Sequence, residues 1–218
     1  AVLSDVGYSF SFYILGFLAL VGVTLGRFVC GWLCPFGLFQ ELLHKIPSPK
    51  ISLGPNFKAL NFIKYGVLII FVLVLPTFWL NDVGMGQPTF CKYICPAGTL
   101  EAGIPLVAMS PTLQAATGFL FKWKLAILLG TVLGSILIFR PFCRWVCPLG
   151  AIYALFNPIS IYHLKVEEDM CTHCMACNRQ CPLKIPVLDE ANSPECIRCG
   201  QCVKACPTGA LKGKFSLE

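Results

Sequence analysis

Fourteen cysteines stand in short, regularly spaced groups along the chain. Near the C-terminus, eight of them form two runs, each with three cysteines separated by two residues and a Cys-Pro pair after three more residues. Thiolate sulfur is a soft ligand that binds iron well, and this spacing lets one loop supply three ligands to one cube-shaped cluster. The pattern therefore predicts two [4Fe–4S] clusters. The first run is Cys171, Cys174, Cys177 and Cys181, and the second is Cys196, Cys199, Cys202 and Cys206.

The fourth cysteine of each run is expected to bind the cluster of the other run, as in two-cluster ferredoxins. The first cluster is then held by Cys171, Cys174, Cys177 and Cys206, and the second by Cys196, Cys199, Cys202 and Cys181. A zinc site is the weaker alternative for this spacing. A disulfide framework is disfavoured, because it gives no reason for a proline after so many cysteines. Metal-bound thiols indicate a reducing compartment.

The other six cysteines occur in three copies of one motif: cysteine, any residue, aromatic, aliphatic, cysteine, proline, any residue, glycine. The copies are Cys30–Gly37, Cys91–Gly98 and Cys143–Gly150. Residues four apart lie on the same side of a helical turn, so each copy is expected to present two thiols together. The proline fits the first turn of a following helix, where its missing N–H is not needed.

A long apolar stretch precedes each motif. The three stretches are Tyr8–Val29, Ala59–Leu80 and Phe119–Phe139, and each is long enough for a membrane-spanning helix. The composition agrees, because 56% of the residues are apolar and only 13% are charged, against about 25% charged in soluble domains. A buried helix of a soluble protein is the alternative for any one stretch, but three in so short a chain favour a membrane. Shorter apolar segments after the motifs are expected to form interfacial or re-entrant helices, namely Phe36–Ile46, Thr99–Met109 and Leu149–Tyr162.

Together these features predict an α-helical membrane protein with about three transmembrane helices plus interfacial or re-entrant helices. Residues 1–164 are expected to form the transmembrane domain with the three motifs. Residues 165–218 are expected to form a small α+β domain of the two-cluster ferredoxin type. The chain begins at Ala1 and not at methionine, so we expect a preceding segment, and these residues contain no signal peptide.

Basic residues are distributed unevenly between the two sides that a three-span topology defines. The side with the ends of the first and third spans is rich in them, and carries Arg27, Lys45, Lys50, Lys58, Lys64, Arg140 and Arg144. The opposite side carries Lys92, Lys122 and Lys124. Loops rich in lysine and arginine stay in the cytoplasm, so we expect a multi-pass protein of the inner membrane with a cytoplasmic ferredoxin-type domain. The net charge of +6 is interpreted as this topology signal, and no nucleic-acid partner is expected.

A third [4Fe–4S] cluster is predicted at the cytoplasmic edge of the membrane. Two of the repeated motifs meet on that side in the three-span topology, and two thiol pairs supply the four ligands of a cluster. The predicted ligands are Cys30, Cys34, Cys143 and Cys147. Inert buried thiols at the starts of helices are the alternative.

The motif with Cys91 and Cys95 is left on the opposite side of the membrane by the same topology. Two thiols alone do not hold a cluster. They are expected to form a redox-active, catalytic dithiol. The alternatives are a cluster shared across a homodimer, pairing with another motif through re-entrant loops, and inert thiols. Lys92 and the helix that starts after Cys95 are expected to favour the thiolate form.

The repeated Cys-x-x-x-Cys-Pro motifs followed by two ferredoxin runs resemble the polyferredoxin-type membrane electron-transfer proteins. That family includes the membrane ferredoxin subunit of periplasmic nitrate reductase systems and the C-terminal part of the nitrous-oxide reduction regulator. The resemblance implies a relay of electrons between a membrane or cytoplasmic donor and an acceptor across the membrane. Because Cys91 and Cys95 add a third motif, the quinol-oxidising role of two-motif members does not transfer directly.

The sequence favours a transmembrane electron conduit in the oxidoreductase class. The expected partners are membrane lipid, a cytoplasmic donor such as a ferredoxin or flavoprotein, and an extracytoplasmic acceptor, such as a thioredoxin-like protein, that reacts with Cys91 and Cys95. A quinone-linked subunit of a periplasmic reductase is one alternative. An iron–sulfur redox sensor or assembly scaffold is another.

Overall fold

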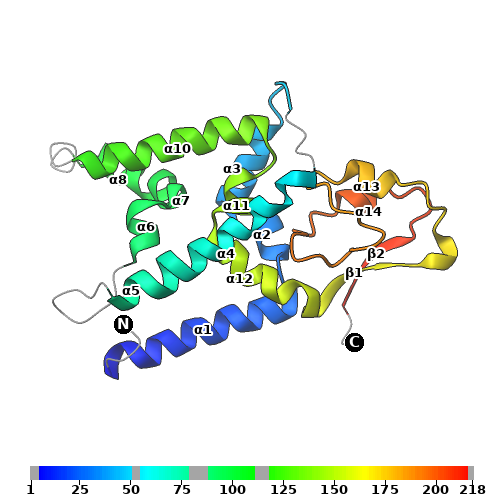
Figure 1. Cartoon of the computed structure of the whole chain (residues 1–218), viewed down its shortest axis with the longest axis horizontal. Coiled ribbons are helices and arrows are strands. Elements are labelled where there is room, and N and C mark those ends of the chain that lie inside the picture. Colours follow the sequence, from blue (N-terminus) through cyan, green and yellow to red (C-terminus); the bar gives the residue numbers. More distant parts are fainter. Residues whose placement is uncertain (1–4, 51–54, 79–87, 111–117, 216–218) are drawn as a thin grey trace. The chain divides into compact units, whose positions relative to one another are not determined.

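The computed structural model describes residues 5–50, 55–78, 88–110 and 118–215, and these are mostly helical (Figure 1). The chain divides into two compact units. The first unit comprises Ala1–Tyr8 and Phe39–Val146, and the second comprises Ser9–Leu38 and Cys147–Glu218. Each unit is described separately below.

The three cysteine motifs share one local fold, in which a short helix breaks at the second cysteine and a new helix starts at the proline. The helix pairs are α2 (Phe28–Trp32) and α3 (Pro35–His44), α6 (Thr89–Tyr93) and α7 (Pro96–Gly98), and α11 (Pro141–Trp145) and α12 (Pro148–Phe156). A residue before proline is pushed out of the α region by steric conflict, and Cys95 and Cys147 accordingly adopt ψ angles of 109° and 116°. The second cysteine is therefore a helix cap, not a position in the helical turn that the sequence predicts.

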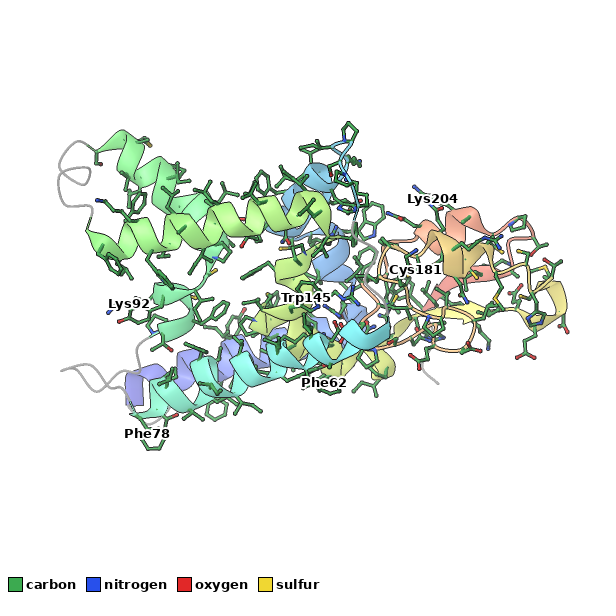
Figure 2. All side chains as sticks on the ribbon, turned by 45° about the horizontal axis from the view of Figure 1, so that its top comes forward. Phe62, Phe78, Lys92, Trp145, Cys181 and Lys204 are labelled. Atoms are coloured by element: carbon green, nitrogen blue, oxygen red, sulfur yellow. The ribbon has the colours of Figure 1, made fainter. Side chains whose placement is uncertain are left out.

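Two long apolar helices belong to the first unit. One runs over Ala59–Phe78 and joins the end of η1 (Pro55–Phe62) to α4 (Ile63–Val67), η2 (Leu68–Val74) and α5 (Leu75–Phe78). The other is α10 (Phe119–Leu137). Both are long and apolar enough to cross a membrane, and only 11% of each apolar window is buried. Figure 2 shows side chains projecting outward around the first of them, between the labelled Phe62 and Phe78.

The remaining predicted span corresponds to α1 (Asp5–Leu25). This helix ends at Gly26, whose φ of +56° is the left-handed conformation typical of a residue just after a helix. It therefore ends before Val29, where the predicted stretch ended. The part of α1 whose side chains are described, Phe12–Leu25, is a shorter apolar helix.

The three shorter apolar segments are helical. Phe36–Ile46 corresponds to α3, and Thr99–Met109 corresponds to η3 (Thr99–Gly103) followed by α8 (Ile104–Met109). The third segment, Leu149–Tyr162, corresponds to most of α12 followed by η4 (Asn157–Ile159).

The C-terminal part of the second unit contains a two-stranded antiparallel sheet. Strand β1 (Tyr162–Val166) pairs with β2 (Leu211–Phe215), so that the beginning and end of this segment lie side by side. Between them lie η5 (Glu168–Met170), α13 (Ala176–Gln180) and α14 (Gln201–Ala205), and α13 packs against α14. The predicted boundary at residue 165 falls within β1.

The core of this segment is small and includes two cysteines. Leu164, Val187 and Leu211 pack around Cys177 and Cys202. Thiols thus occupy positions that larger apolar side chains fill in an ordinary core.

Candidate iron–sulfur centres

Two cavities in the ferredoxin-type segment are each lined by four cysteines. The first is lined by Cys171, Cys174, Cys177 and Cys206, together with Val166, Leu188 and Leu211. The second is lined by Cys181, Cys196, Cys199 and Cys202, together with Leu164, Ile185 and Val187. These are the two ligand sets that the sequence predicts, and in each cavity three cysteines come from one run and one from the other.

The cysteine loops wind through left-handed residues at matching positions. His173 and Met175 have positive φ angles in the first run, and Arg198 and Gly200 have them in the second. Alternation of left- and right-handed residues turns successive N–H groups toward one point, which suits an anionic group. Each run then leaves its helix at a Cys-Pro pair and carries its fourth cysteine to the other cavity.

The first cavity is the more open of the two. Cys174 is exposed, and a backbone hydrogen bond from Ala176 lowers the pKa of its thiol. A hydrogen bond with the Thr208 hydroxyl lowers the pKa of Cys206 to about 7. Both shifts favour the thiolate, the form that binds metal.

Burial dominates in the second cavity. Burial, together with the charges of Cys196, Cys199 and Cys181, raises the pKa of Cys202 to about 12. Four thiolates gathered in a partly buried cavity need a compensating positive charge, and a metal group would supply it while releasing the thiol protons. The donor set of each cavity therefore fits a [4Fe–4S] cluster.

Within the described ranges, no three His, Cys, Asp or Glu side chains converge closely enough to hold one metal ion. In a cluster, each thiolate binds a different iron, so its ligands lie farther apart than the ligands of one ion.

The second unit also brings three cysteines of the repeated motifs together. Burial raises the pKa of Cys147 to about 11, and the neighbouring charges of Cys30 and Cys34 contribute to this rise. The backbone N–H of Gly37 donates to Cys34 Sγ at 3.4 Å, and the N–H of Gly150 opposes the rise at Cys147. The motif glycine thus supplies the N–H of the third helical residue, which helix caps commonly accept.

Cys143 belongs to the first unit and is buried there. The side chain of Gln40 on α3 donates from Nε2 to Cys143 Sγ at 3.1 Å and accepts at Oε1 from the N–H of Phe142 at 3.3 Å. Trp145 has a buried indole N–H without a hydrogen-bond partner among the described residues. Such a donor is costly to bury alone, and a cluster sulfide near the motif would satisfy it.

Helix α6, with Cys91, lies alongside the two long helices of the first unit, as Figure 1 shows. The Thr89 hydroxyl donates to the carbonyl of Phe71, inside the Ala59–Phe78 helix. From α10, Lys124 donates to the carbonyl of Cys91 at 3.2 Å. The ring centroid of Phe90 also lies 6.4 Å from that of Phe142, the residue before Cys143. This motif therefore packs against the sides of the two long helices.

The net shift at Cys91 is opposite to the expected one, because its thiol is not stabilised as a thiolate. The Lys92 ammonium lies 5.4 Å from the centre of the Tyr93 ring, on its own helix. Although Cys91 is exposed, partial desolvation raises the pKa of its thiol; the charge of Cys95 adds to the rise, and Lys124 opposes it. The sequence places Lys124 33 residues away from Cys91, so no local pattern announces the pair.

The first motif packs directly against the ligand loop of the second cavity. Trp32 Nε1 on α2 donates to the carbonyl of Arg198 at 3.3 Å, and Gly31 meets the carbonyl of Ile197 with no space for a side chain. The guanidinium of Arg198 donates to the carbonyls of Leu25 and Asn157. A loop between Cys196 and Cys199 is thereby fixed to the helix that carries Cys30.

Asn157 connects the same elements from within and was not predicted from the sequence. It is fully buried, its Oδ1 accepts from the N–H of Arg27, and its Nδ2 donates to the carbonyls of Ser193 and Cys196. The guanidinium of Arg27 in turn pairs with Glu195 at 3.3 Å. An asparagine at the end of an apolar helix is the only sequence signal for this role.

Known protein families match most of the chain. One family of 4Fe-4S binding domains matches three segments, residues 6–54, 64–104 and 123–163, each containing one copy of the repeated motif. A second family of 4Fe-4S binding domains matches residues 192–212, which contain the second ferredoxin run.

Relatives of known sequence cover most of the chain. An uncharacterised protein of Methanocaldococcus jannaschii is 30% identical over 85% of this chain and 63% of its own length. The putative electron transport protein YccM of Escherichia coli is 23% identical over 91% of the chain and 54% of its own length. The ferredoxin-type protein NapH of Escherichia coli is 24% identical over 83% of the chain and 59% of its own length.

The chain thus spans less than two thirds of the length of each of these relatives. No solved structure is significantly similar to it. The matches agree with the cysteine-lined cavities and the repeated motif turns, and the family models describe 4Fe-4S binding domains. The chain therefore belongs to the polyferredoxin-type family of 4Fe–4S electron-transfer proteins.

Proposed function

We propose that the chain conducts electrons across a membrane, from a reduced cytoplasmic carrier such as a ferredoxin or flavoprotein to an acceptor on the other side. Bound [4Fe–4S] clusters supply one-electron transfer. The observation that carries the proposal is the packing of α2, with Cys30, against the loop between Cys196 and Cys199.

A membrane location is supported by the surface of the long helices. Ala59–Phe78 and Phe119–Leu137 have mean hydropathies of 2.1 and 1.6, yet only 11% of each window is buried. The core helix of a soluble protein buries its apolar side chains, so these helices need lipid around them. With α1 as a third span, the excess of lysine and arginine on one side supports a cytoplasmic ferredoxin-type segment in a protein of the inner membrane.

Twelve cysteines are the proposed ligands of three clusters. The two cavities of the ferredoxin-type segment hold the first two clusters. The third is assigned to the thiols of the first and third motifs, of which three already interact within the second unit. These last ligands are Cys30, Cys34, Cys143 and Cys147.

Exposure of the two cavities supports a direction for the path. Cys174 of the first cavity is exposed, so a soluble donor approaches there. The second cavity is the one whose loop contacts α2. Electrons would therefore pass from the first ferredoxin site to the second and then to the cysteines at the start of the membrane helices.

Cys91 and Cys95 are the proposed terminal dithiol. Two electrons, delivered one at a time, and two protons convert a disulfide between them into two thiols. Attack of the resulting thiolate on the disulfide of a thioredoxin-like partner then passes both electrons on, and restores the disulfide. Support comes from the exposure of Cys91 and from its electrostatic interaction with Cys95.

A quinone-linked role is a second candidate. The observation in its favour is that α6 lies alongside the apolar helices, where a lipid-soluble carrier has access. In this reading, the thiols of Cys91 and Cys95 are dispensable for electron transfer.

Iron content and electron transfer together test these proposals. Anaerobically purified protein should contain about twelve irons per chain. The double substitution Cys30→Ser/Cys34→Ser should remove about four of them and abolish transfer to acceptors enclosed in proteoliposomes. About eight irons in the unsubstituted protein would eliminate the third cluster.

The matched control is Cys91→Ser/Cys95→Ser. We expect full iron content but no reduction of a thioredoxin-like acceptor. If this variant keeps its full iron content and still reduces an enclosed quinone, the second candidate is favoured. If it loses about four irons, Cys91 and Cys95 are cluster ligands.

A further inference from the structure

Gln40 is a buried amide in direct contact with a cysteine. Its side chain is 1% exposed and extends from α3, where its Nε2 lies 3.1 Å from Cys143 Sγ. Its Oε1 lies 3.3 Å from the backbone nitrogen of Phe142. One side chain therefore contacts two successive residues of the third motif.

The orientation of this amide follows from its partners. The backbone N–H of Phe142 only donates, so the atom facing it must be the amide oxygen. The amide NH₂ is then directed at the sulfur. A thiolate accepts such a bond more strongly than a neutral thiol, because charge-assisted hydrogen bonds are the stronger ones.

The third motif has a matching residue. Gln40 follows the second cysteine of its motif, Cys34, by six residues, and Tyr153 follows Cys147 by the same number. The Tyr153 side chain is 3% exposed, and its hydroxyl lies near enough to Cys30 for the two groups to interact electrostatically. In both cases, a buried polar side chain at this position approaches the first cysteine of the other motif.

We propose that Gln40 is a positioning residue that donates a hydrogen bond to the Cys143 thiolate and thereby raises the reduction potential of the cluster bound there. The inference rests on the proposed function, which makes Cys143 a cluster ligand. A reduced cluster carries one more negative charge than an oxidised one. A donor to its sulfur therefore stabilises the reduced state more, and hydrogen bonds to sulfur are among the factors that set these potentials.

The test is a potentiometric EPR titration of the full chain after anaerobic purification. Gln40→Met keeps a side chain of similar length but removes the donor. The potential of the third cluster should become more negative, so that its reduced-to-oxidised ratio at a fixed ambient potential falls by up to about tenfold, or about 59 mV for one electron. The two ferredoxin clusters should keep their potentials.

A second variant and a control complete the design. Gln40→Glu keeps the shape and the acceptor oxygen but turns an oxygen toward the sulfur, so it should lower the potential further. Glu101→Met is the control, because Glu101 follows Cys95 by the same six residues, is exposed, and should change no potential.

The outcomes separate this inference from the proposed function. Twelve irons in both Gln40 variants with an unchanged third potential would overturn the role of Gln40 and leave the conduit standing. Loss of about four irons in both variants would also overturn it, because Gln40 would then be needed for assembly. Absence of the third cluster from unsubstituted protein would instead remove the proposed function itself.

Discussion

A side chain at position 31 would collide with the backbone of Ile197. A Cβ built on Gly31 would lie 2.4 Å from the Ile197 carbonyl oxygen, a separation that real contacts do not reach. The glycine therefore lets α2 approach the loop between Cys196 and Cys199 at backbone distance. Short separation matters for this chain because the proposed path passes from that loop to Cys30.

Gly31→Ala should force the helix and the loop apart. We expect a loss of stability of about 1–3 kcal/mol, as for overpacked sites, with all twelve irons retained. Electron transfer between the second and third clusters should slow, which freeze-quench EPR after mixing with a reduced donor measures. Gly130→Ala is the control, because nothing lies within 4 Å of its added Cβ and alanine is the better helix former. Equal rates of electron transfer in the two variants would show that the contact between Gly31 and Ile197 does not limit transfer.

Asn157→Ala should disturb the second ferredoxin site from outside its ligand set. The substitution leaves the carbonyls of Ser193 and Cys196 without their donor, at about 1–3 kcal/mol for each unsatisfied group. We expect a lower melting temperature and a changed EPR line shape for the second cluster. Asn192→Ala is the comparison, because Asn192 bonds only the backbone of Leu164 in β1 among the contacts described. An unchanged second-cluster spectrum in the Asn157 variant would contradict this role.

Removal of iron should unfold the small sheet. The core around Leu164 and Leu211 includes Cys177 and Cys202, so loss of the clusters leaves thiols in place of cross-links between loops. After oxidation and chelation, amide hydrogens of β1 and β2 should exchange much faster, while those of α10 in the first unit should not. Mass spectrometry of the exchanged peptides measures the exchange of the strands and of α10 separately. Unchanged protection of the strands would show that the apolar residues suffice for the fold.

The topology gives a prediction for the end of the chain. A tag placed after Glu218 should resist protease in intact cells and become sensitive once the inner membrane is opened, because basic residues gather on the side of the ferredoxin-type segment. Digestion in intact cells would place that segment outside and reverse the direction of the proposed path. An extracytoplasmic control protein confirms that the protease reaches the membrane surface.

The sequence predicts the local features of this fold well because their causes are local. Steric conflict before a proline ends α6 and α11 at their cysteine pairs, and the x2 spacing brings three cysteines of each run to one cavity. Apolar length likewise locates the helix of Ala59–Phe78. Each of these signals is contained within a few consecutive residues or one helix.

The residues that the sequence did not reveal act over long separations. Gln40 contacts Cys143 from 103 positions away, and Arg27 contacts Asn157 from 130 positions away. A buried amide has no periodicity or spacing that marks its partner. The position of α6 alongside the long helices has the same origin, because it depends on Thr89 reaching Phe71 and Lys124 reaching Cys91.

The last prediction concerns the cation beside Cys91. Burial and the charge of Cys95 raise the pKa of the Cys91 thiol, and Lys124 lowers it, so Lys124→Met should raise this pKa further. At pH 8, below the raised pKa, the thiolate fraction then falls, and alkylation of Cys91 in the reduced protein should slow by roughly twofold to fivefold, the effect of about 0.4–1 kcal/mol for a partly screened charge. Raising the pH above the shifted pKa should restore the rate, because both proteins are then fully thiolate. Lys92→Met is the matched comparison, because it removes the same charge from a side chain that lies over the Tyr93 ring, and it should slow alkylation less than Lys124→Met. Peptide mass spectrometry measures the alkylation of Cys91 separately from that of the other cysteines. Equal slowing by both substitutions would show that Lys124 does not act on Cys91 more strongly than Lys92 does.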